Sequence, residues 1–421
     1  MTVHVVGAGL AGLAAAVRLA AAGRRVVLYE AAPQAGGRCR SYHDKTLDRV
    51  IDNGNHLMLS GNESLFDYLR QIGAEGSLAG PKGADYPFVD LKTGQRWMVQ
   101  IKGGRWSRWL KDPTRDVPGS SIRFRLRASR LPFAGSDMTV QACLGATGPL
   151  WERFWDPMAT AVLNTPPDQA SARLLWAALR ESFAKGGAAC RPLVARNSLA
   201  ESLIDPALTF LAGRHADLYF GQRLREVDVE RRVETLQFAG LEVELDLDDH
   251  VVLALPPQQV ADLLPGIPTP RAAHAIVNVH FLLSEPVRMP RRSMLIGLVG
   301  GEAQWLFVRG EIASVTVSAA DALAEEDADV IASLLWGDVA RALDQPIDPV
   351  PPFRVIKEKR ATFSQTPAEL ERRPPTRTRW PNLHLAGDWT DTGLPATIEG
   401  AVRSGQRAAD AVLETEGRLP S

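Results

Sequence analysis

The sequence predicts an α/β fold, and stretches at the two ends of the chain lead to this prediction. Near the start, an apolar strand at residues 3–6 runs into a glycine-rich turn, then an alanine-rich helix at 13–22 and a second strand at 25–29. Near the end, a strand at 382–386 is followed by a loop and by a helix that begins at 396–401. Strands that alternate with helices in this way are typical of a parallel sheet covered by helices.

The glycine-rich turn has the G-x-G-x-x-G spacing at Gly7, Gly9 and Gly12. The first glycine permits a tight turn, the second lets the backbone approach a pyrophosphate, and the third lets the helix pack closely on the strand. Glu30 lies 23 positions after Gly7, where a carboxylate can accept from both ribose hydroxyls and would repel a 2′-phosphate. The pattern therefore predicts a site for FAD or NAD rather than NADP. A βαβ unit that has lost its ligand is the alternative.

Two further motifs favour FAD, each with a ligand-free alternative. Gly36 and Gly37 let the main chain pass close to a phosphate, and Arg38 can neutralise it; the alternative is a solvated loop. The strand at 382–386 ends in Gly387 and Asp388, and this carboxylate can accept from a ribityl hydroxyl. The helix after it can direct its N–H groups at N1 and O2 of a flavin. On pattern alone, a strand-turn-helix without a ligand is equally allowed.

Composition limits the classes of partner. The chain has 421 residues, enough for two or three substructures, with 48 basic and 49 acidic side chains and a net charge of −1. This balance argues against nucleic acid. Cys39, Cys143 and Cys190 are widely spaced, so we expect neither a metal site nor a disulfide framework, and a reducing cytoplasm fits best. No signal peptide and no stretch of eighteen apolar residues is recognisable.

The order of the elements predicts two interleaved domains. Alternating strands between 217 and 245, a buried strand at 250–255 and the C-terminal strand and helix belong with the first βαβ unit. Strands at 275–283, 293–299 and 314–318, with a helix at 324–343, indicate a second sheet. We therefore expect a nucleotide-binding domain formed by residues 1–62, 200–265 and 378–421. We expect an inserted α+β substrate domain formed by residues 63–199 and 266–377.

Two stretches invite a functional interpretation beside a structural one. The turn at 52–55 contains good turn formers, but it also carries Asp52 and is followed by His56, which could transfer protons beside a cofactor ring. The segment 102–131 carries nine Lys and Arg residues against two Asp, interleaved with Trp and aliphatic side chains. Such a segment suits an anionic bilayer surface; an ordinary solvated face is the alternative.

Taken together, these motifs resemble the FAD-dependent amine oxidase and phytoene desaturase superfamily. They are the G-x-G-x-x-G turn, Glu30, Gly36-Gly37-Arg38, Ala254-Leu255-Pro256-Pro257 and Leu385-Ala386-Gly387-Asp388. The resemblance implies a Rossmann-like FAD-binding domain built from discontinuous segments. The chain looks most like the hydroxysqualene dehydroxylases of hopanoid synthesis, through Asp52-Asn53-Gly54-x-His56-Leu57, Leu163-Asn164-Thr165-Pro166-Pro167 and Gly387-Asp388-Trp389-Thr390.

This resemblance implies a reaction and a set of site residues. FAD would be non-covalent, because no cysteine lies near the C-terminal flavin segment. Reduced FAD would convert a C30 isoprenoid alcohol, hydroxysqualene, to squalene, and an external reductant would then reduce the flavin again. The implied setting is the cytoplasm, with contact at the inner face of the membrane. We expect Asp52 and His56 to be catalytic. The expected cofactor-binding residues are Gly7, Gly9, Leu10, Ala11, Gly12, Glu30, Gly36, Gly37, Arg38, Val227, Gly387, Asp388, Thr397 and Ile398.

Two other functions stay open at this point. The first is an oxidative desaturase or amine oxidase on the same scaffold, and the second is a non-catalytic lipid-binding protein. The intact glycines, Glu30 and Asp388 argue against the second.

Overall fold

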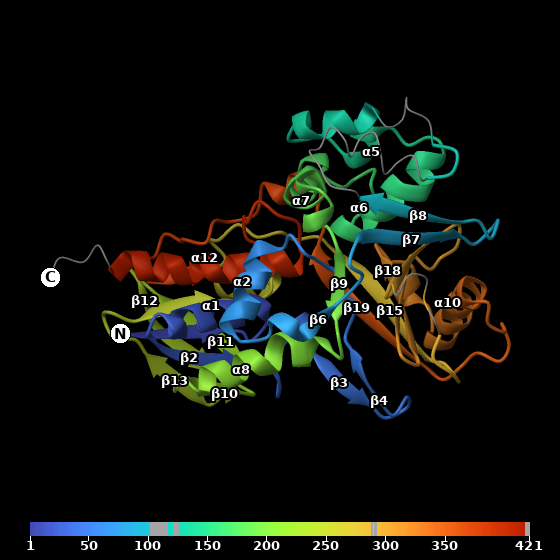
Figure 1. The fold of residues 1–421 in the computed structure, drawn as a ribbon. Coiled ribbons are helices and arrows are strands. Elements are labelled where there is room, and N and C mark those ends of the chain that lie inside the picture. Colours follow the sequence, from blue (N-terminus) through green and yellow to red (C-terminus); the bar gives the residue numbers. More distant parts are fainter. Residues whose placement is uncertain (102–116, 121–125, 288, 290–292, 417–421) are drawn as a thin grey trace.

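The computed structural model describes residues 1–101, 117–120, 126–287, 289 and 293–416. Two sheets form its two ends, with the N-terminus and the C-terminal helix at one end and the second sheet at the other (Figure 1). Within the described residues, no helix is both long enough and apolar enough to cross a bilayer.

The first sheet has five parallel strands in the order β10-β2-β1-β14-β20. Their bounds are Thr2–Val6 (β1), Arg25–Glu30 (β2), Asp217–Phe220 (β10), His250–Leu253 (β14) and Leu383–Leu385 (β20). The strands come from four distant parts of the chain, as the sequence predicts for a discontinuous domain. Because all of them are parallel, their carboxyl ends meet at one edge, where ligands bind in open α/β sheets.

Helices α1 (Leu10–Ala21) and α12 (Ile398–Glu416) lie against this sheet and against each other (Figure 1). Their buried alanines and leucines form one core with the inner face of β1 and β2. A Cβ on Gly405 would lie 2.0 Å from the carbonyl oxygen of Ala11, so only glycine permits this approach. The contact holds the last helix of the chain beside the first.

The opposite face of the first sheet is covered by a three-stranded antiparallel meander and a short helix. These elements are β11 (Leu224–Val229), β12 (Val233–Phe238), β13 (Leu241–Glu244) and α9 (Pro257–Leu263). Val227 on β11 lies in the same buried cluster as Val6 and Tyr29. Val227 thus belongs to the core between the meander and the first sheet.

The second sheet has seven strands in the order β19-β15-β18-β17-β16-β7-β8, antiparallel except where β16 meets β7. The bounds are Ala84–Asp90 (β7), Arg96–Ile101 (β8), Ala273–Leu282 (β15), Leu295–Val299 (β16), Trp305–Arg309 (β17), Ile312–Ser318 (β18) and Phe353–Phe363 (β19). Helix α10 (Ala328–Leu343) covers one face. Helices α5 (Val140–Leu144), α6 (Asp156–Leu163) and α7 (Ala172–Glu181) cover the other.

Several connecting elements pack against a different domain from the one predicted for them. Helix α2 (Glu63–Gln71) and strand β9 (Pro192–Ala195) share the core of α1 and α8 (Asp205–Ala212). Strand β9 also pairs with β5 (Met58–Leu59) and β6 (Leu78–Ala79). The apolar face of α2 therefore belongs with the first sheet, so the packing boundary follows α2 rather than preceding it. Among the described residues, the short helix α11 (Pro367–Leu370) follows β19.

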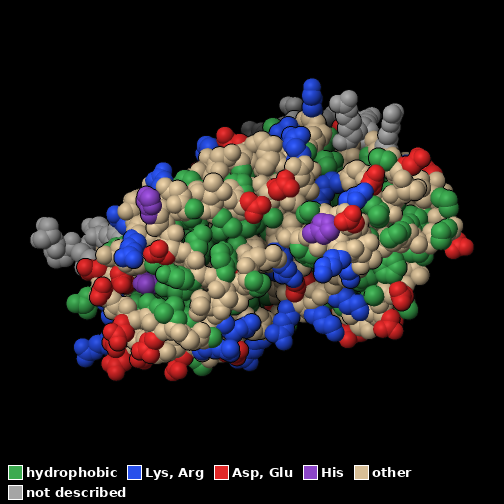
Figure 2. Space-filling model, turned by 90° about the horizontal axis from the view of Figure 1, so that it is seen from below, with side chains coloured by type: hydrophobic (Ala, Val, Ile, Leu, Met, Phe, Trp, Pro, Cys, Tyr) green, Lys and Arg blue, Asp and Glu red, His purple; other side chains and the backbone are tan. Residues whose placement is uncertain are grey.

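A hairpin of β3 (Ser41–Asp44) and β4 (Arg49–Asp52) joins the first domain to the second sheet. Figure 2 shows Lys and Arg side chains gathered across the middle of this side of the molecule, with acidic groups mainly toward the two ends. Arg49 pairs with Glu311 at 2.8 Å, and Arg354 on β19 pairs with Asp44. These cations therefore tie the hairpin to the inserted domain.

Candidate active site

The glycine-rich turn has the geometry that its spacing predicts. Gly7 has φ +106°, and a Cβ there would lie 2.4 Å from the carbonyl oxygen of Ala254. A Cβ on Gly12 would lie 1.8 Å from the carbonyl oxygen of Gly7. A Cβ on Gly9, in contrast, would meet none of the described residues within 4 Å. Gly7 and Gly12 are thus needed for packing, while Gly9 leaves open space in front of the N-terminus of α1.

The second glycine pair lies directly against this turn. The N–H of Gly36 donates to the carbonyl oxygen of Ala8 at 2.8 Å, and a Cβ on Gly37 would lie 3.3 Å from Cα of Gly9. The two oxygens of Glu30 accept from the N–H groups of Ala8 and Ala32, each at 2.8 Å. A carboxylate has further lone pairs for two ribose hydroxyls. The two glycine loops and Glu30 therefore form one continuous backbone cradle.

Arg38 and Asp388 bring the two ends of the chain together. Nη2 of Arg38 donates to Oδ1 of Asp388 at 2.8 Å, and its Nη1 donates to the carbonyl oxygen of Ala361 on β19. The Asp388 carboxylate raises the pKa of this guanidinium. Arg38 is predicted to bind a phosphate, and Asp388 is predicted to bind the ribityl chain. In the structure these two side chains pair with each other. The pair links the second glycine loop, the end of β20 and the inserted sheet.

The loop after β20 is shaped around a buried arginine that the sequence analysis did not single out. Arg373 donates to the carbonyl oxygens of Asp388, Trp389, Thr390 and Leu394, and its side chain lies over the ring of Phe363. Burial lowers the pKa of Arg373 to about 10, so the guanidinium is still charged at neutral pH. One side chain therefore fixes the path from Asp388 to the start of α12.

Helix α12 begins at Ile398, one residue after Thr397, as the sequence predicts within two residues. Oγ1 of Thr397 accepts from the N–H of Gly400 at 3.1 Å and caps the first turn. Glu399 also lies in this turn and is buried. Glu399 is not among the predicted site residues. Acidic residues are favoured at the N-terminus of a helix, and this preference is the signal in the sequence that could have identified it.

Asp52 is 3% exposed and fully engaged by protein groups. Its Oδ1 accepts from Oγ of Ser41 at 2.6 Å and from the N–H of Leu199 at 2.9 Å. Its Oδ2 pairs with Nη2 of Arg309 at 2.7 Å. These partners fix the Asp52 side chain in the turn, where β4, β17 and the segment before α8 meet.

His56 lies close to Asp52 but makes weaker contacts. Its Nε2 is 3.9 Å from Sγ of Cys39, the residue after Arg38. Burial lowers the pKa of His56 to about 4, and the Asp52 carboxylate opposes that shift. Burial likewise lowers the pKa of His280 on β15 to about 4, and its ring contacts Oγ of Ser314 and the carbonyl oxygen of Asp52. Both rings are therefore neutral at pH 7.

A small cavity opens beside this turn. Its volume is about 20 Å³, room for a single water molecule or hydroxyl group. Its lining combines four polar residues, Asp52, Asn55, His56 and Arg309, with five apolar ones, Val194, Ala195, Leu199, Met294 and Phe307. The cavity could thus hold a hydroxyl group at the end of an apolar chain.

The residues present fit a bound FAD. The open space at Gly9, the uncapped start of α1 and the carboxylate of Glu30 suit the adenosine diphosphate half. Arg38 and Asp388, which pair at 2.8 Å, and the first turn of α12 are the residues predicted to hold the rest of the cofactor. Residues 10–12 form the first turn of α1, and Val227 is buried in the cluster on the other face of the first sheet. The individual contacts stay predictions.

The fold and this cradle define a flavoprotein oxidoreductase, and comparison with known proteins identifies the family. The model of the flavin containing amine oxidoreductase family matches residues 10–413. A hydroxysqualene dehydroxylase from Rhodopseudomonas palustris is 47% identical over 98% of both chains. One from Sinorhizobium fredii is 43% identical over 98% of both chains. The chain belongs to the flavin containing amine oxidoreductases, in the group of the hydroxysqualene dehydroxylases.

Solved structures agree with this assignment at the level of fold. A putrescine oxidase is 17% identical, with a TM-score of 0.73 over 98% of this chain and 99% of that one. Cyclohexylamine oxidase from Brevibacterium oxydans is 16% identical, with a TM-score of 0.72 over 99% of both chains. The predicted family, the Rossmann-like α/β fold and the dependence on FAD are thereby confirmed.

Proposed function

We propose that this protein removes the allylic hydroxyl group of hydroxysqualene reductively and forms squalene. The observation that carries the proposal is full-length identity of 43–47% to three curated hydroxysqualene dehydroxylases, the third from Zymomonas mobilis. Bound FAD, when reduced, supplies a hydride. The chain itself must then supply a proton for the leaving hydroxyl, orient that carbon, and keep water away from the allylic cation.

The contacts at the turn divide these tasks between His56 and Asp52. Both carboxylate oxygens of Asp52 accept hydrogen bonds, including one from a guanidinium, so its role is to hold the turn in place. The Nε2 atom of His56 lies 3.9 Å from Sγ of Cys39, and the side chain lines the cavity. Burial lowers the pKa of His56 to about 4, so the ring is neutral at pH 7 and must take up a proton from water before it can protonate the leaving hydroxyl group. We therefore assign proton transfer to His56 and its orientation to Asp52.

Anaerobic turnover tests this function. We expect the photoreduced holoprotein to convert hydroxysqualene into squalene, detected by mass spectrometry. His56→Ala should lower the single-turnover rate by roughly 100-fold or more, as for loss of a general acid, and should keep FAD bound. His43→Ala, at an exposed histidine on β3, is the matched control and should leave the rate unchanged. Full turnover by a His56→Ala, Asp52→Asn double variant would remove both residues from these roles.

Oxidative desaturation is less well supported. A probable zeta-carotene desaturase from Synechococcus elongatus is only 26% identical, although the match covers 99% of both chains. Product analysis separates the two reactions. Oxygen-dependent gain of a double bond, without loss of hydroxyl under anaerobic conditions, would favour the desaturase.

We also propose that the protein contacts the cytoplasmic face of a membrane, where a C30 hydrocarbon resides. The predicted basic segment 102–131 lies outside the described residues except for 117–120 and 126–131. In the adjoining turn, Leu126–Phe133, the Phe133 side chain is 86% exposed and Leu126 is 61% exposed, with the cation Arg130 between them. Exposed apolar groups beside a cation suit an anionic bilayer.

Vesicle flotation checks the membrane contact. With phosphatidylglycerol-containing vesicles, Phe133→Ser and Arg130→Glu should each reduce bound protein severalfold, and added salt should weaken wild-type binding. Val330→Ser, at a half-exposed valine on α10, serves as the control. If the amount of bound protein were unchanged by salt and by both substitutions, the proposed membrane-contacting surface would be contradicted.

A further inference from the structure

Helix α7 of the inserted domain is attached at its N-terminal end to the segment before α12. The N–H of Ser171, which caps α7, donates to the carbonyl oxygen of Gln365 at 2.9 Å. The side chain of Gln365 is fully buried, accepts from the N–H of Ala396 at 2.9 Å, and donates to the carbonyl oxygen of Leu163. Gln365 thus joins the end of α6, the start of α7 and the approach to α12.

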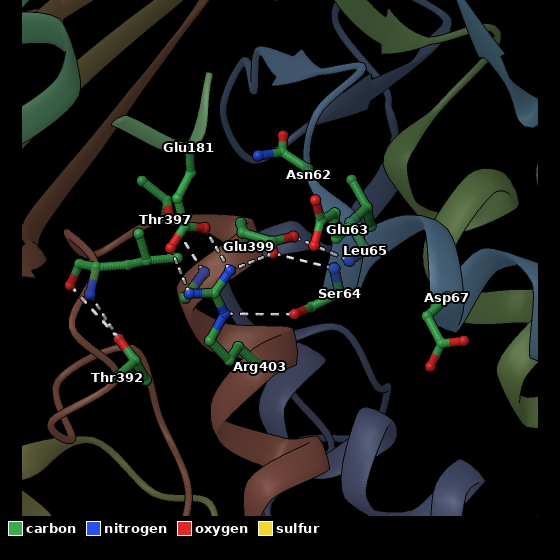
Figure 3. Close-up of polar contacts among 12 residues, drawn as sticks. Asn62, Glu63, Ser64, Leu65, Asp67, Glu181, Thr392, Thr397, Glu399 and Arg403 are labelled. Atoms are coloured by element: carbon green, nitrogen blue, oxygen red, sulfur yellow. Dashed lines mark hydrogen bonds and ion pairs between the residues drawn. The ribbon is translucent and has the colours of Figure 1, made fainter. Parts of the chain in front are cut away.

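The C-terminal end of α7 is attached to α12 itself by an ion-pair cluster. Glu181, the last residue of α7, accepts two hydrogen bonds from Arg403, at 3.0 and 2.6 Å. Arg403 also pairs with Glu399 at 2.9 Å. Glu399 accepts in turn from the N–H groups of Ser64 and Leu65, at 3.0 and 2.9 Å. Figure 3 shows Arg403 on α12 between Glu181 and Glu399, with Ser64 on α2 facing the same guanidinium.

This cluster is more than a surface ion pair. The side chains of Arg403 and Glu399 are 18% and 5% exposed, so little water screens their interaction. Arg403 lowers the pKa of Glu181, which keeps that group ionised. A bidentate arginine also fixes the direction of both partners. Loss of Arg403 would leave Glu399 buried near the start of α12 without its cation.

The two attachments act on the same helix turn. Ala396 and Glu399 flank Thr397 and Ile398, the residues predicted to face N1 and O2 of the flavin. Between the attachments, Leu174, Leu175 and Leu179 of α7 are buried in the apolar core of the inserted domain. A displacement of α7 would therefore be transmitted to the part of the site where reduction places negative charge.

We propose that Arg403, with Glu181 and Gln365, positions the first turn of α12 relative to the inserted domain and thereby sets the affinity and reduction potential of the bound flavin. The proposal rests on the predicted placement of FAD against α12. It does not depend on which substrate the protein reduces.

Charge-changing variants test this role. Arg403→Met leaves the carboxylates of Glu181 and Glu399 without their cation near the predicted flavin site. The midpoint potential of the flavin should therefore fall, and the dissociation constant for FAD should rise at least tenfold. Glu181→Gln removes one negative charge and keeps Arg403 beside Glu399, so the potential should not fall. Arg403→Lys should recover part of the potential but not the bidentate contact. The matched control is Arg377→Met, which breaks the exposed Arg377–Glu414 pair near the other end of α12.

Hydrogen exchange of the FAD-free protein gives a second readout. In Arg403→Met and in Gln365→Leu, amides of α7 and of the first turn of α12 should exchange faster than in wild type, and Arg377→Met should match wild type there. The proposal is overturned if Arg403→Met matches Arg377→Met in FAD affinity, midpoint potential and exchange. Neither readout uses hydroxysqualene, so failure of the proposed reaction would be seen separately.

Discussion

Alanine at Gly9 is expected to leave the protein folded but to weaken FAD binding by roughly 100-fold, or about 3 kcal/mol. The backbone of Gly9 has φ −73°, which alanine adopts without strain. Its Cβ would meet none of the described protein atoms within 4 Å, so the fold has no reason to change. The methyl group would instead occupy the space in which a pyrophosphate approaches the start of α1. Fluorescence titration of FAD into the apoprotein measures this change.

Alanine at Gly12 is the informative contrast. There the added Cβ would lie 1.8 Å from the carbonyl oxygen of Gly7, and α1 would have to move away from the strand before it. We expect Gly12→Ala to lower thermal stability as well as flavin content, whereas Gly9→Ala lowers only flavin content. If Gly9→Ala bound FAD as tightly as wild type, the pyrophosphate would not lie at this turn.

Removal of the Arg309 charge is expected to lower the free energy of unfolding by about 3–5 kcal/mol, the usual cost of leaving a buried charge without its partner. Arg309→Leu would leave the Asp52 carboxylate, which is 3% exposed, between two sheets without its cation. Urea denaturation of the holoprotein gives the measurement. The double variant Arg309→Leu, Asp52→Asn should regain part of the loss, because no unpaired charge then remains.

The nearby pair of Arg49 and Glu311 is the control for this prediction. It also joins the hairpin to the second sheet, but its side chains are 46% and 38% exposed. Arg49→Leu should therefore cost at most about 1 kcal/mol. Equal effects of Arg49→Leu and Arg309→Leu would show that burial of the Asp52 pair contributes nothing.

Local signals in the sequence predicted the nucleotide-binding part well. The strand, turn and helix expected at 3–22 are Thr2–Val6 and Leu10–Ala21 in the structure. Each of these elements is defined by its own residues: apolar runs for the strands, alanines for the helix, and glycines where the backbone must turn. The C-terminal strand and helix were recognisable for the same reason, through Gly387, Asp388 and the turn before α12.

The second sheet was only partly predictable, because its strands depend on tertiary partners. The hydrophobic pattern predicts three strands there, whereas the described residues form seven. Strand β7 contains Pro87, and β19 contains the charged run 357–360, so neither resembles an ordinary buried strand. Arg309 meets Asp52 across 257 positions, a contact that follows from the order of strands and has no local signal.

The order of strands in the first sheet also has a consequence for synthesis. Strand β1 lies between β2 and β14, while β20, at residues 383–385, comes last in the strand order and pairs with β14. At typical translation rates the ribosome needs on the order of 20–80 s to make the chain between β1 and β20. The inserted sheet, whose last strand ends at Phe363, can therefore form before the nucleotide-binding sheet is complete. A nascent chain that stalls before β20 lacks Asp388 and α12, which are predicted to bind the flavin, so we expect that it does not hold a reduced flavin that would pass electrons to oxygen.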